Sequence, residues 1–174
     1  MTGIRPYTNA DAAECCLIVN AAIGEMDGLN EAARDFIRRK NTLEQFGAEL
    51  SDYYTLVYES QGRLLGVGSL DGHEIKRIYV LPGTQGQGVG RALMQALEAK
   101  GQRWGITELQ LDASPSAVRF YEQLGYVRGE PGGFSRGEAE FRYVTMRKTL
   151  VSRDEAIVRR SPEVENHLTN RQSV

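Results

Sequence analysis

The middle of the chain has the pattern of a β-meander. YYTLVYE (53–59), RLLGVGSL (63–70) and EIKRIYVL (74–81) are rich in aromatic, aliphatic and β-branched residues, which is typical of strands. The short polar segments SQG and DGH separate these runs, and connections of this length join antiparallel neighbours. The pattern therefore predicts three consecutive antiparallel strands.

Segments with a helical period surround this meander. Apolar residues recur at helical spacing in ADAAECCLIVNAAIG, and Thr8 or Asn9 before it can cap a helix. Helices are predicted over 10–24, within 29–49, over 90–102 and over 114–125. Ser114 followed by proline fits an N-cap with proline in the first turn.

The remaining segments complete the sheet. Strands are predicted over 3–7, 107–113, 126–130 and 138–150, with a loop over 131–137. Because a helix connects 74–81 to 107–113, these two strands should be parallel neighbours. The predicted fold class is α+β, with a mixed, mostly antiparallel central sheet flanked by helices.

Length and composition indicate one globular domain. The chain has 174 residues, 41% hydrophobic and 25% charged, and we assign residues 1–149 to the domain. The polar segment 150–174 is expected to be a solvated tail, with docking on a partner subunit as the alternative.

Charge and apolar pattern narrow the functional classes. The net charge of −2 gives no electrostatic basis for nucleic-acid binding. The longest apolar run, Cys15 to Val19, is too short to span a membrane, and the acidic N-terminus lacks the plan of a signal peptide. A cytoplasmic protein is expected. Two cysteines and two histidines without ligand spacing predict no metal site, and Cys15 and Cys16 are expected to pack in a helix.

Four glycines mark the most distinctive segment, VLPGTQGQGVGRALM. They fall within eight positions where a predicted strand turns into a helix, at Gly83, Gly86, Gly88 and Gly90. A strand, a glycine-rich turn and a helix N-terminus form an anion-binding device. The P-loop pattern fails because valine stands at 89 where it needs lysine, and the dinucleotide-binding pattern fails because arginine stands at 91 where it needs glycine.

This segment resembles the GCN5-related N-acetyltransferase (GNAT) family. Residues 85–90, QGQGVG, match the family's Q/R-x-x-G-x-G/A motif. SPSAVRFYEQLGYV (114–127) resembles its motif N-x-x-A-x-x-F-Y-x-x-x-G-F, with serine in place of the asparagine. The order of elements is similar from about residue 3 to residue 149.

The resemblance implies that acetyl-coenzyme A (acetyl-CoA) is the acetyl donor. The strands 74–81 and 107–113 would splay apart, and the pantetheine arm would lie between them. Ile78 would pair with the thioester carbonyl and Val80 with the pantetheine amides. The implied donor-site residues are Ile78, Tyr79, Val80, Gln85, Gly86, Gln87, Gly88, Val89, Gly90, Arg91, Ser114 and Tyr121.

The implied reaction is direct attack of a primary amine on the thioester, through a tetrahedral intermediate. Tyr121 would protonate the leaving thiolate, although a core aromatic residue is the alternative. Glu74 would be the general base, with a solvated carboxylate as the alternative. Alternation places Glu74 on the face of Ile78 and Val80 unless a bulge intervenes, about 13 Å from Ile78. His73 and Asp112 are lesser candidates.

The acceptor is predicted only as a small-molecule or peptide amine. By the same resemblance, residues 25–44 and 131–137 would shape its site. A non-catalytic acyl-CoA-binding sensor is the rival function, because a fold does not fix an activity. The sequence is compatible with a homodimer and does not determine the oligomeric state.

Overall fold

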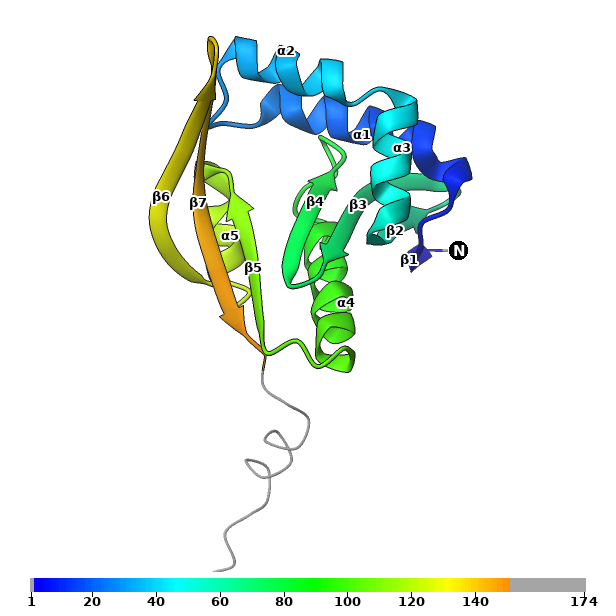
Figure 1. The fold of residues 1–174 in the computed structure, drawn as a ribbon. Helices are drawn as coiled ribbons and strands as arrows, with labels where there is room; N and C mark the ends of the chain where they lie inside the picture. Colours follow the sequence, from blue (N-terminus) through cyan, green and yellow to red (C-terminus); the bar gives the residue numbers. More distant parts are fainter. Residues whose placement is uncertain (1, 151–174) are drawn as a thin grey trace, which may run out of the picture.

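A seven-stranded sheet organises the part of the chain that the computed structural model describes, residues 2–150 (Figure 1). The strands are β1 (Thr2–Pro6), β2 (Tyr54–Ser60), β3 (Arg63–Asp71), β4 (Glu74–Val80), β5 (Glu108–Ala113), β6 (Val127–Arg136) and β7 (Ala139–Thr149). Their order across the sheet is β1-β2-β3-β4-β5-β7-β6. The predicted polar tail lies outside the described residues, apart from residue 150.

The strand pairing matches the predicted fold class. β4 and β5 are parallel, as expected from the helix between them, and the other neighbours are antiparallel. β2, β3 and β4 form the predicted meander.

Helices cover both faces of the sheet (Figure 1). They are α1 (Ala12–Glu25), α2 (Glu31–Lys40), α3 (Leu43–Asp52), α4 (Val89–Arg103) and α5 (Val118–Glu122), with short 3₁₀ turns η1 (Asn9–Asp11) and η2 (Pro115–Ala117). One hydrophobic cluster lies under α4 and α5, where Leu93, Met94 and Leu97 are fully buried. A second cluster lies under α1 and α3, around Ile18 and Phe46.

Two sequence predictions are wrong in their boundaries. The single helix expected within 29–49 is two helices, α2 and α3, because Thr42 begins a new helix by accepting a hydrogen bond from the Gln45 N–H at 3.3 Å. The loop expected over 131–137 is mostly strand, because β6 resumes its pairing with β7 at Pro131 after a bulge. Glycine and proline lowered the strand propensity of this segment, but an edge strand tolerates them.

β4 and β5 separate along their length. Only one residue pair, Glu74 with Gln110, joins them in the described chain, supported by a 3.0 Å hydrogen bond from the Gln110 N–H to the His73 carbonyl. In Figure 1 the two strands converge near their N-terminal ends and diverge toward α1 and α2. The predicted splay is therefore present.

A bulge in β4 reverses the alternation of its side chains. Arg77 has a φ of 57°, and the register against β3 shifts between Val67 and Ser69. Lys76 is opposite Ser69 and Tyr79 is opposite Val67, so these two β4 residues share a face although three positions separate them. Such bulges re-aim side chains beside active sites.

Candidate active site

The loop between β4 and α4 depends on glycine. Gly83, Gly86 and Gly88 have φ values of 82°, 80° and 83°, and this left-handed conformation costs other residues about 1–2 kcal/mol. A Cβ on any of them would meet no atom within 4 Å. The three glycines therefore shape the loop and leave open space beside its backbone.

The first turn of α4 offers unpaired N–H donors. Gly88 is the N-cap, and no side chain caps the helix. The first intrahelical hydrogen bond runs from the Ala92 N–H to the Gly88 carbonyl at 2.9 Å, so the N–H groups of Val89, Gly90 and Arg91 have no partner within the helix. Together with the helix dipole, they form a site suited to an anion such as a phosphate.

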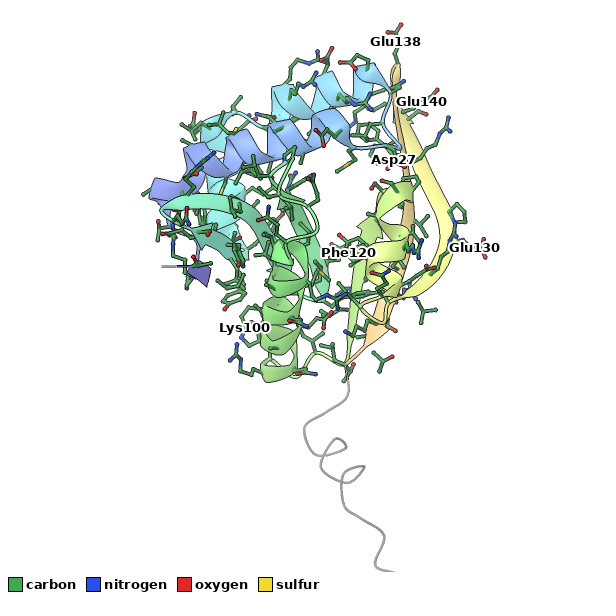
Figure 2. The ribbon with its side chains drawn as sticks, turned by 180° about the vertical axis from the view of Figure 1, so that it is seen from behind. Asp27, Lys100, Phe120, Glu130, Glu138 and Glu140 are labelled. Atoms are coloured by element: carbon green, nitrogen blue, oxygen red, sulfur yellow. The ribbon has the colours of Figure 1, made fainter. Side chains whose placement is uncertain are left out.

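Gly90 has a packing role instead. Its φ is not positive, but a Cβ would lie 3.2 Å from Cζ of Phe120 and 3.5 Å from Cγ2 of Val80. Figure 2 shows Phe120 on the side of α5 that faces α4. The absence of a side chain at residue 90 thus lets α5 approach the start of α4.

A cavity of about 610 Å³ lies beside this loop. We call it the donor cavity, after the role that the sequence resemblance implies for the residues beside it. All of the predicted donor-site residues except Gln87 line it. The backbone N–H of Gln87 instead bonds the Thr84 carbonyl at 3.4 Å. Ala22, Glu25 and Met26, at the end of α1, also line the cavity. Glu25 and Met26 belong to the segment 25–44 that the resemblance assigned to the acceptor site, whereas Ala22 was not predicted at either site.

The edge of β4 faces the donor cavity with free backbone groups. Leu81 donates its N–H to the Leu65 carbonyl at 2.8 Å, and Tyr79 pairs with Val67. Because hydrogen-bonding direction alternates along an antiparallel strand, Val80 points its N–H away from β3, and Ile78 follows by the same alternation. Since β5 has separated from β4 there, these N–H groups meet no neighbouring strand.

A second cavity, of about 700 Å³, adjoins the first. We call it the acceptor cavity, because Met26, Leu29 and Phe134, from the segments that the resemblance assigns to the acceptor, line it. Its walls come from β4, β5, β6, β7, α3 and the α1–α2 connection. Six residues line both cavities and define their junction: Met26, Ile78, Tyr79, Ser114, Ala117 and Tyr121.

Tyr121 lies at this junction with a protonated phenol. Its residue exposure is 8%, and burial raises the pKa of its hydroxyl above the ordinary value, with a smaller contribution from Tyr79. The phenol is therefore neutral at physiological pH and is available to donate a proton or a hydrogen bond. Its ring packs edge-on against Phe120 and Tyr126.

Glu74 faces the acceptor cavity but not on the expected face of the strand. Ile78 packs toward α4, where its Cδ1 lies 2.5 Å from a Cβ built on Gly68, whereas Glu74 lines the acceptor cavity on the other face. The bulge at Arg77 causes this reversal. The Glu74 carboxylate also lies 3.0 Å from the Lys76 ammonium.

The other base candidates lie apart from each other. His73 lies on the β3–β4 turn and lines neither cavity. Asp112 lines the acceptor cavity, where its carboxylate accepts a 2.7 Å hydrogen bond from the Thr145 hydroxyl. Ser114 lies at the junction and begins η2, without a side-chain capping bond.

The α1–α2 connection closes over the acceptor cavity. Asp27 accepts hydrogen bonds from Ser116 N–H at 2.9 Å and Ser116 Oγ at 2.7 Å. Asn30 donates to the Glu138 carbonyl at 2.8 Å and accepts from the Glu140 N–H at 3.0 Å. Figure 2 places Asp27, Glu138 and Glu140 at this end of the molecule. Local sequence patterns do not predict these particular contacts, because the partners lie 89 and 110 residues apart.

Membrane-spanning helices and metal-binding groups are both absent from residues 2–150. None of the helices there has the length and apolar character needed to cross a membrane. No group of three or more His, Cys, Asp and Glu side chains in this part of the chain is arranged to hold a metal ion.

Comparison with known proteins identifies relatives with the same architecture. A crystal structure described as a GCN5-related N-acetyltransferase, "Aminotransferase, Class-II", from Rhodopseudomonas palustris is 31% identical, with a TM-score of 0.79 over 86% of this chain and 96% of that chain. The PaiA N-acetyltransferase of Thermoplasma acidophilum, solved in complex with coenzyme A, is 18% identical, with a TM-score of 0.71 over 86% of this chain and 99% of that chain. The second likeness concerns the fold alone.

A protein found by sequence comparison is also described as an N-acetyltransferase. An uncharacterized N-acetyltransferase of Lactobacillus delbrueckii subsp. lactis, encoded in the pepI 3′ region, is 24% identical over 173 residues, covering 87% of this chain and all of that protein. The model of the acetyltransferase (GNAT) domain family matches residues 21–150. This match spans the glycine loop, the splayed strands and both cavities, and the chain belongs to the GNAT acetyltransferase family.

Proposed function

We propose that this protein transfers an acetyl group from acetyl-CoA to the nitrogen of a primary amine. The observation that carries the proposal is the meeting of two cavities at Tyr121, one beside the glycine loop and one beside the splayed end of β4 and β5. Acetyl-CoA supplies the activated thioester. The residues of the protein bind acetyl-CoA, orient its thioester and transfer protons during the reaction.

The glycine loop is the proposed binding site for the pyrophosphate. Its unpaired N–H groups, from Val89 to Arg91, and the α4 dipole favour a doubly charged anion. Gly86 and Gly88 leave room for the phosphates to approach the backbone. Gln85 and Arg91 also line this part of the cavity and complete the proposed pocket, and the Gln85 side-chain oxygen accepts a 2.7 Å hydrogen bond from the Gly83 N–H within the loop.

The edge of β4 is the proposed binding site for the pantetheine arm and the reacting carbonyl. The Val80 N–H faces the gap between the splayed strands and is suited to a pantetheine amide. The Ile78 N–H, one alternation earlier, lies at the junction and is suited to the thioester carbonyl oxygen as it gains negative charge. Such a donor, fixed by the sheet, needs no rearrangement during the reaction.

Tyr121 is the proposed acid and Glu74 the proposed base. The neutral Tyr121 phenol borders both cavities, so it can deliver a proton to a thiolate at the junction. Glu74 lines the acceptor cavity four residues before Ile78, so a water would carry the proton from the amine to its carboxylate.

Binding and turnover together test this function. Acetyl-CoA at about 100 times its dissociation constant should add about 2.7 kcal/mol to the free energy of unfolding, seen as a rise in melting temperature, whereas ATP and NAD should add little. Thiol release from acetyl-CoA should then depend on an added amine. Binding without amine-dependent release would favour the sensor function, and no binding would overturn the proposal.

A further inference from the structure

Three carboxylates line the acceptor cavity, those of Glu49, Glu74 and Asp112, and they differ in whether a cation of the protein is paired with them. Glu49 is bound by the Arg77 guanidinium at 2.6 Å, and Glu74 by the Lys76 ammonium at 3.0 Å. Asp112 is exposed, forms no ion pair within 4.0 Å among residues 2–150, and accepts a hydrogen bond from the Thr145 hydroxyl at 2.7 Å. A cationic group entering the cavity therefore finds one carboxylate without a competing internal cation.

Asp112 also lies in the right part of the cavity for an amine that must reach the thioester. It follows Gln110, where β4 and β5 still pair, by two residues, or about 7 Å of strand into the splayed region. It precedes Ser114, a junction residue, by two positions. The Asp112 carboxylate thus lies on the acceptor side close to the point where the two cavities meet.

An apolar surface extends from Asp112 toward the end of β6 and the beginning of β7. Thr145 is opposite Asp112. Tyr143 and Phe141 precede Thr145 by two and four positions along β7, so all three side chains share a face of the sheet. Phe134 stacks on Phe141 with ring centroids 4.4 Å apart. We call Phe134, Phe141 and Tyr143 the aromatic wall, and all three line the acceptor cavity.

The backbone beside the aromatic wall fixes its shape. A Cβ on Gly132 would lie 2.6 Å from the Tyr143 ring, so glycine lets that ring lie against β6. Leu29, in the α1–α2 connection, forms an isolated bridge with Phe141 and also lines the cavity. Leu29 therefore covers part of the aromatic wall, and the remaining space accommodates a compact apolar group better than an extended chain.

We propose that the acceptor is a small amine with a single positive charge and an apolar, aromatic or alkyl, body. Asp112 binds its ammonium group, and the aromatic wall binds its body. This proposal rests on the proposed function and specifies the substrate class of the same site. Before attack, the ammonium passes its proton through a water to the Glu74 carboxylate, so Asp112 is a binding residue and not the base.

The remaining charges of the cavity argue against other amines. An amino acid carries a carboxylate next to its amine, but the cations Lys76 and Arg77 are already paired with carboxylates. Arg142 also lines the cavity, but it alternates to the opposite face of β7 from Phe141 and Tyr143, and its guanidinium lies 3.6 Å from the Glu140 carboxylate. A diamine or polyamine needs a second carboxylate, but the other two of the cavity, Glu49 and Glu74, are already paired with Arg77 and Lys76. Its second ammonium would therefore lie beside the aromatic wall without a carboxylate partner. Desolvating an unpaired charge there is unfavourable.

Steady-state acetylation of matched amines tests the substrate class. The wild-type protein is assayed with 2-phenylethylamine, phenylalanine and 1,4-diaminobutane. We expect the highest kcat/KM for 2-phenylethylamine, by at least about 10-fold, because each alternative carries an unmatched charge. A preference for phenylalanine or for the diamine would overturn the assignment of the cavity.

The variant D112N tests the ammonium site. Asparagine has nearly the same shape and retains an oxygen that can accept the Thr145 hydrogen bond. We expect KM for 2-phenylethylamine to rise about 10- to 100-fold, the range for a lost hydrogen bond to a charged group. The affinity for acetyl-CoA and the KM for aniline, which is neutral at pH 7, should stay within about twofold. An unchanged KM for 2-phenylethylamine, or an equal rise for aniline, would refute the role of Asp112.

The variant E108Q is the matched control. Glu108 lies on the same face of β5 and is also opposite a threonine of β7, Thr149, but it does not line the acceptor cavity. Its kinetics should equal those of the wild type. If no amine supports thiol release although acetyl-CoA binds, the proposed function itself fails. If amines are acetylated but D112N behaves as the wild type, only the present inference fails.

Discussion

Arg77 and Glu49 join the bulged strand β4 to helix α3 through three hydrogen bonds. The Arg77 Nη2 donates to the two carboxylate oxygens at 2.6 and 2.7 Å, and its Nε donates to one of them at 3.1 Å. The guanidinium also lies over the Phe46 ring, 5.6 Å from its centroid. This contact holds a residue with positive φ in place beside the junction of the two cavities.

The variant E49Q should therefore be less stable than the wild type. Glutamine removes the charge and leaves the guanidinium with weaker acceptors in a partly buried site, where the Arg77 side chain is 24% exposed. We expect the free energy of unfolding to fall by about 1–3 kcal/mol, measured by urea denaturation. E44Q, on the exposed first turn of the same helix, should change it by less than about 0.5 kcal/mol. Equal effects of the two variants would show that the Arg77 contact contributes little.

The variant Y121F tests the proposed acid. Removing the hydroxyl should lower kcat by about 100-fold or more, the usual contribution of a general acid, with acetyl-CoA affinity unchanged because the ring remains. Stability should not fall, since no protein group in the described chain is recorded as bonding this hydroxyl. Y126F is the control, because the Tyr126 ring lies 6.0 Å from that of Tyr121 but lines neither cavity. A kcat for Y121F within threefold of the wild type would assign Tyr121 to the core alone.

Substitution of Gly88 by alanine should affect both stability and donor binding. The φ of 83° makes the alanine variant less stable by about 1–2 kcal/mol, and its Cβ would occupy the open space beside the α4 N-terminus. G83A is the matched control, because Gly83 has nearly the same φ but does not line the donor cavity. Both variants should lose stability in thermal denaturation, whereas calorimetry should record weaker acetyl-CoA binding for G88A alone. Equal acetyl-CoA affinities would contradict the proposed pyrophosphate site.

The variant E74Q tests the proposed base separately from Asp112. Glutamine cannot take up the amine's proton, so kcat at pH 7 should fall by about 10-fold or more while KM for the amine stays constant. This is the opposite pattern to D112N, for which KM should change. The kcat of E74Q should also recover at high pH, where a larger fraction of the amine is already deprotonated. A kcat of E74Q equal to that of the wild type at pH 7 would mean that solvent, and not Glu74, removes the proton from the amine.

The lining of the cavity beside the glycine loop was predictable because the resemblance to the GNAT family is carried by two local motifs. The glycines from 83 to 90 encode the turn, the positive φ values and the start of α4 within one short segment, and the segment around Tyr121 follows about 30 residues later. The order of strands and helices then places both segments on one side of the splay between β4 and β5. The resemblance, and not the residues alone, predicted that the two segments meet there.

The acceptor site was less predictable because distant segments build it. Its walls include Glu49 on α3, Asp112 on β5 and Phe141 on β7, and nothing in their local sequence indicates that they meet. The bulge at Arg77 was equally hidden, since a non-glycine residue with φ of 57° has no sequence signature. That one residue moved Glu74 to the opposite face of β4 from Ile78.

The interaction of Asp11 with Arg5 should make stability depend on acidic pH. The Arg5 guanidinium donates to both carboxylate oxygens at 2.8 Å, and this contact is the main reason that the pKa of Asp11 is lowered to about 2. Hydrogen bonds from Thr8 to the same carboxylate act in the same direction. Because the folded pKa lies below the unfolded value near 3.8, the contribution to stability is complete above about pH 5 and is lost as the pH falls toward 2.

The variant D11N removes this dependence. It should be less stable than the wild type at pH 6 by about 2 kcal/mol, and the difference should shrink by about 1 kcal/mol at pH 3, because the wild type alone loses the charged contact. Urea denaturation at the two pH values measures both differences. D52N, at the exposed end of α3, should differ from the wild type by less than about 0.5 kcal/mol at either pH. A difference between D11N and the wild type that stays constant from pH 6 to pH 3 would mean that Asp11 stabilises the fold through its shape and hydrogen bonds, and that the Arg5 charge adds nothing.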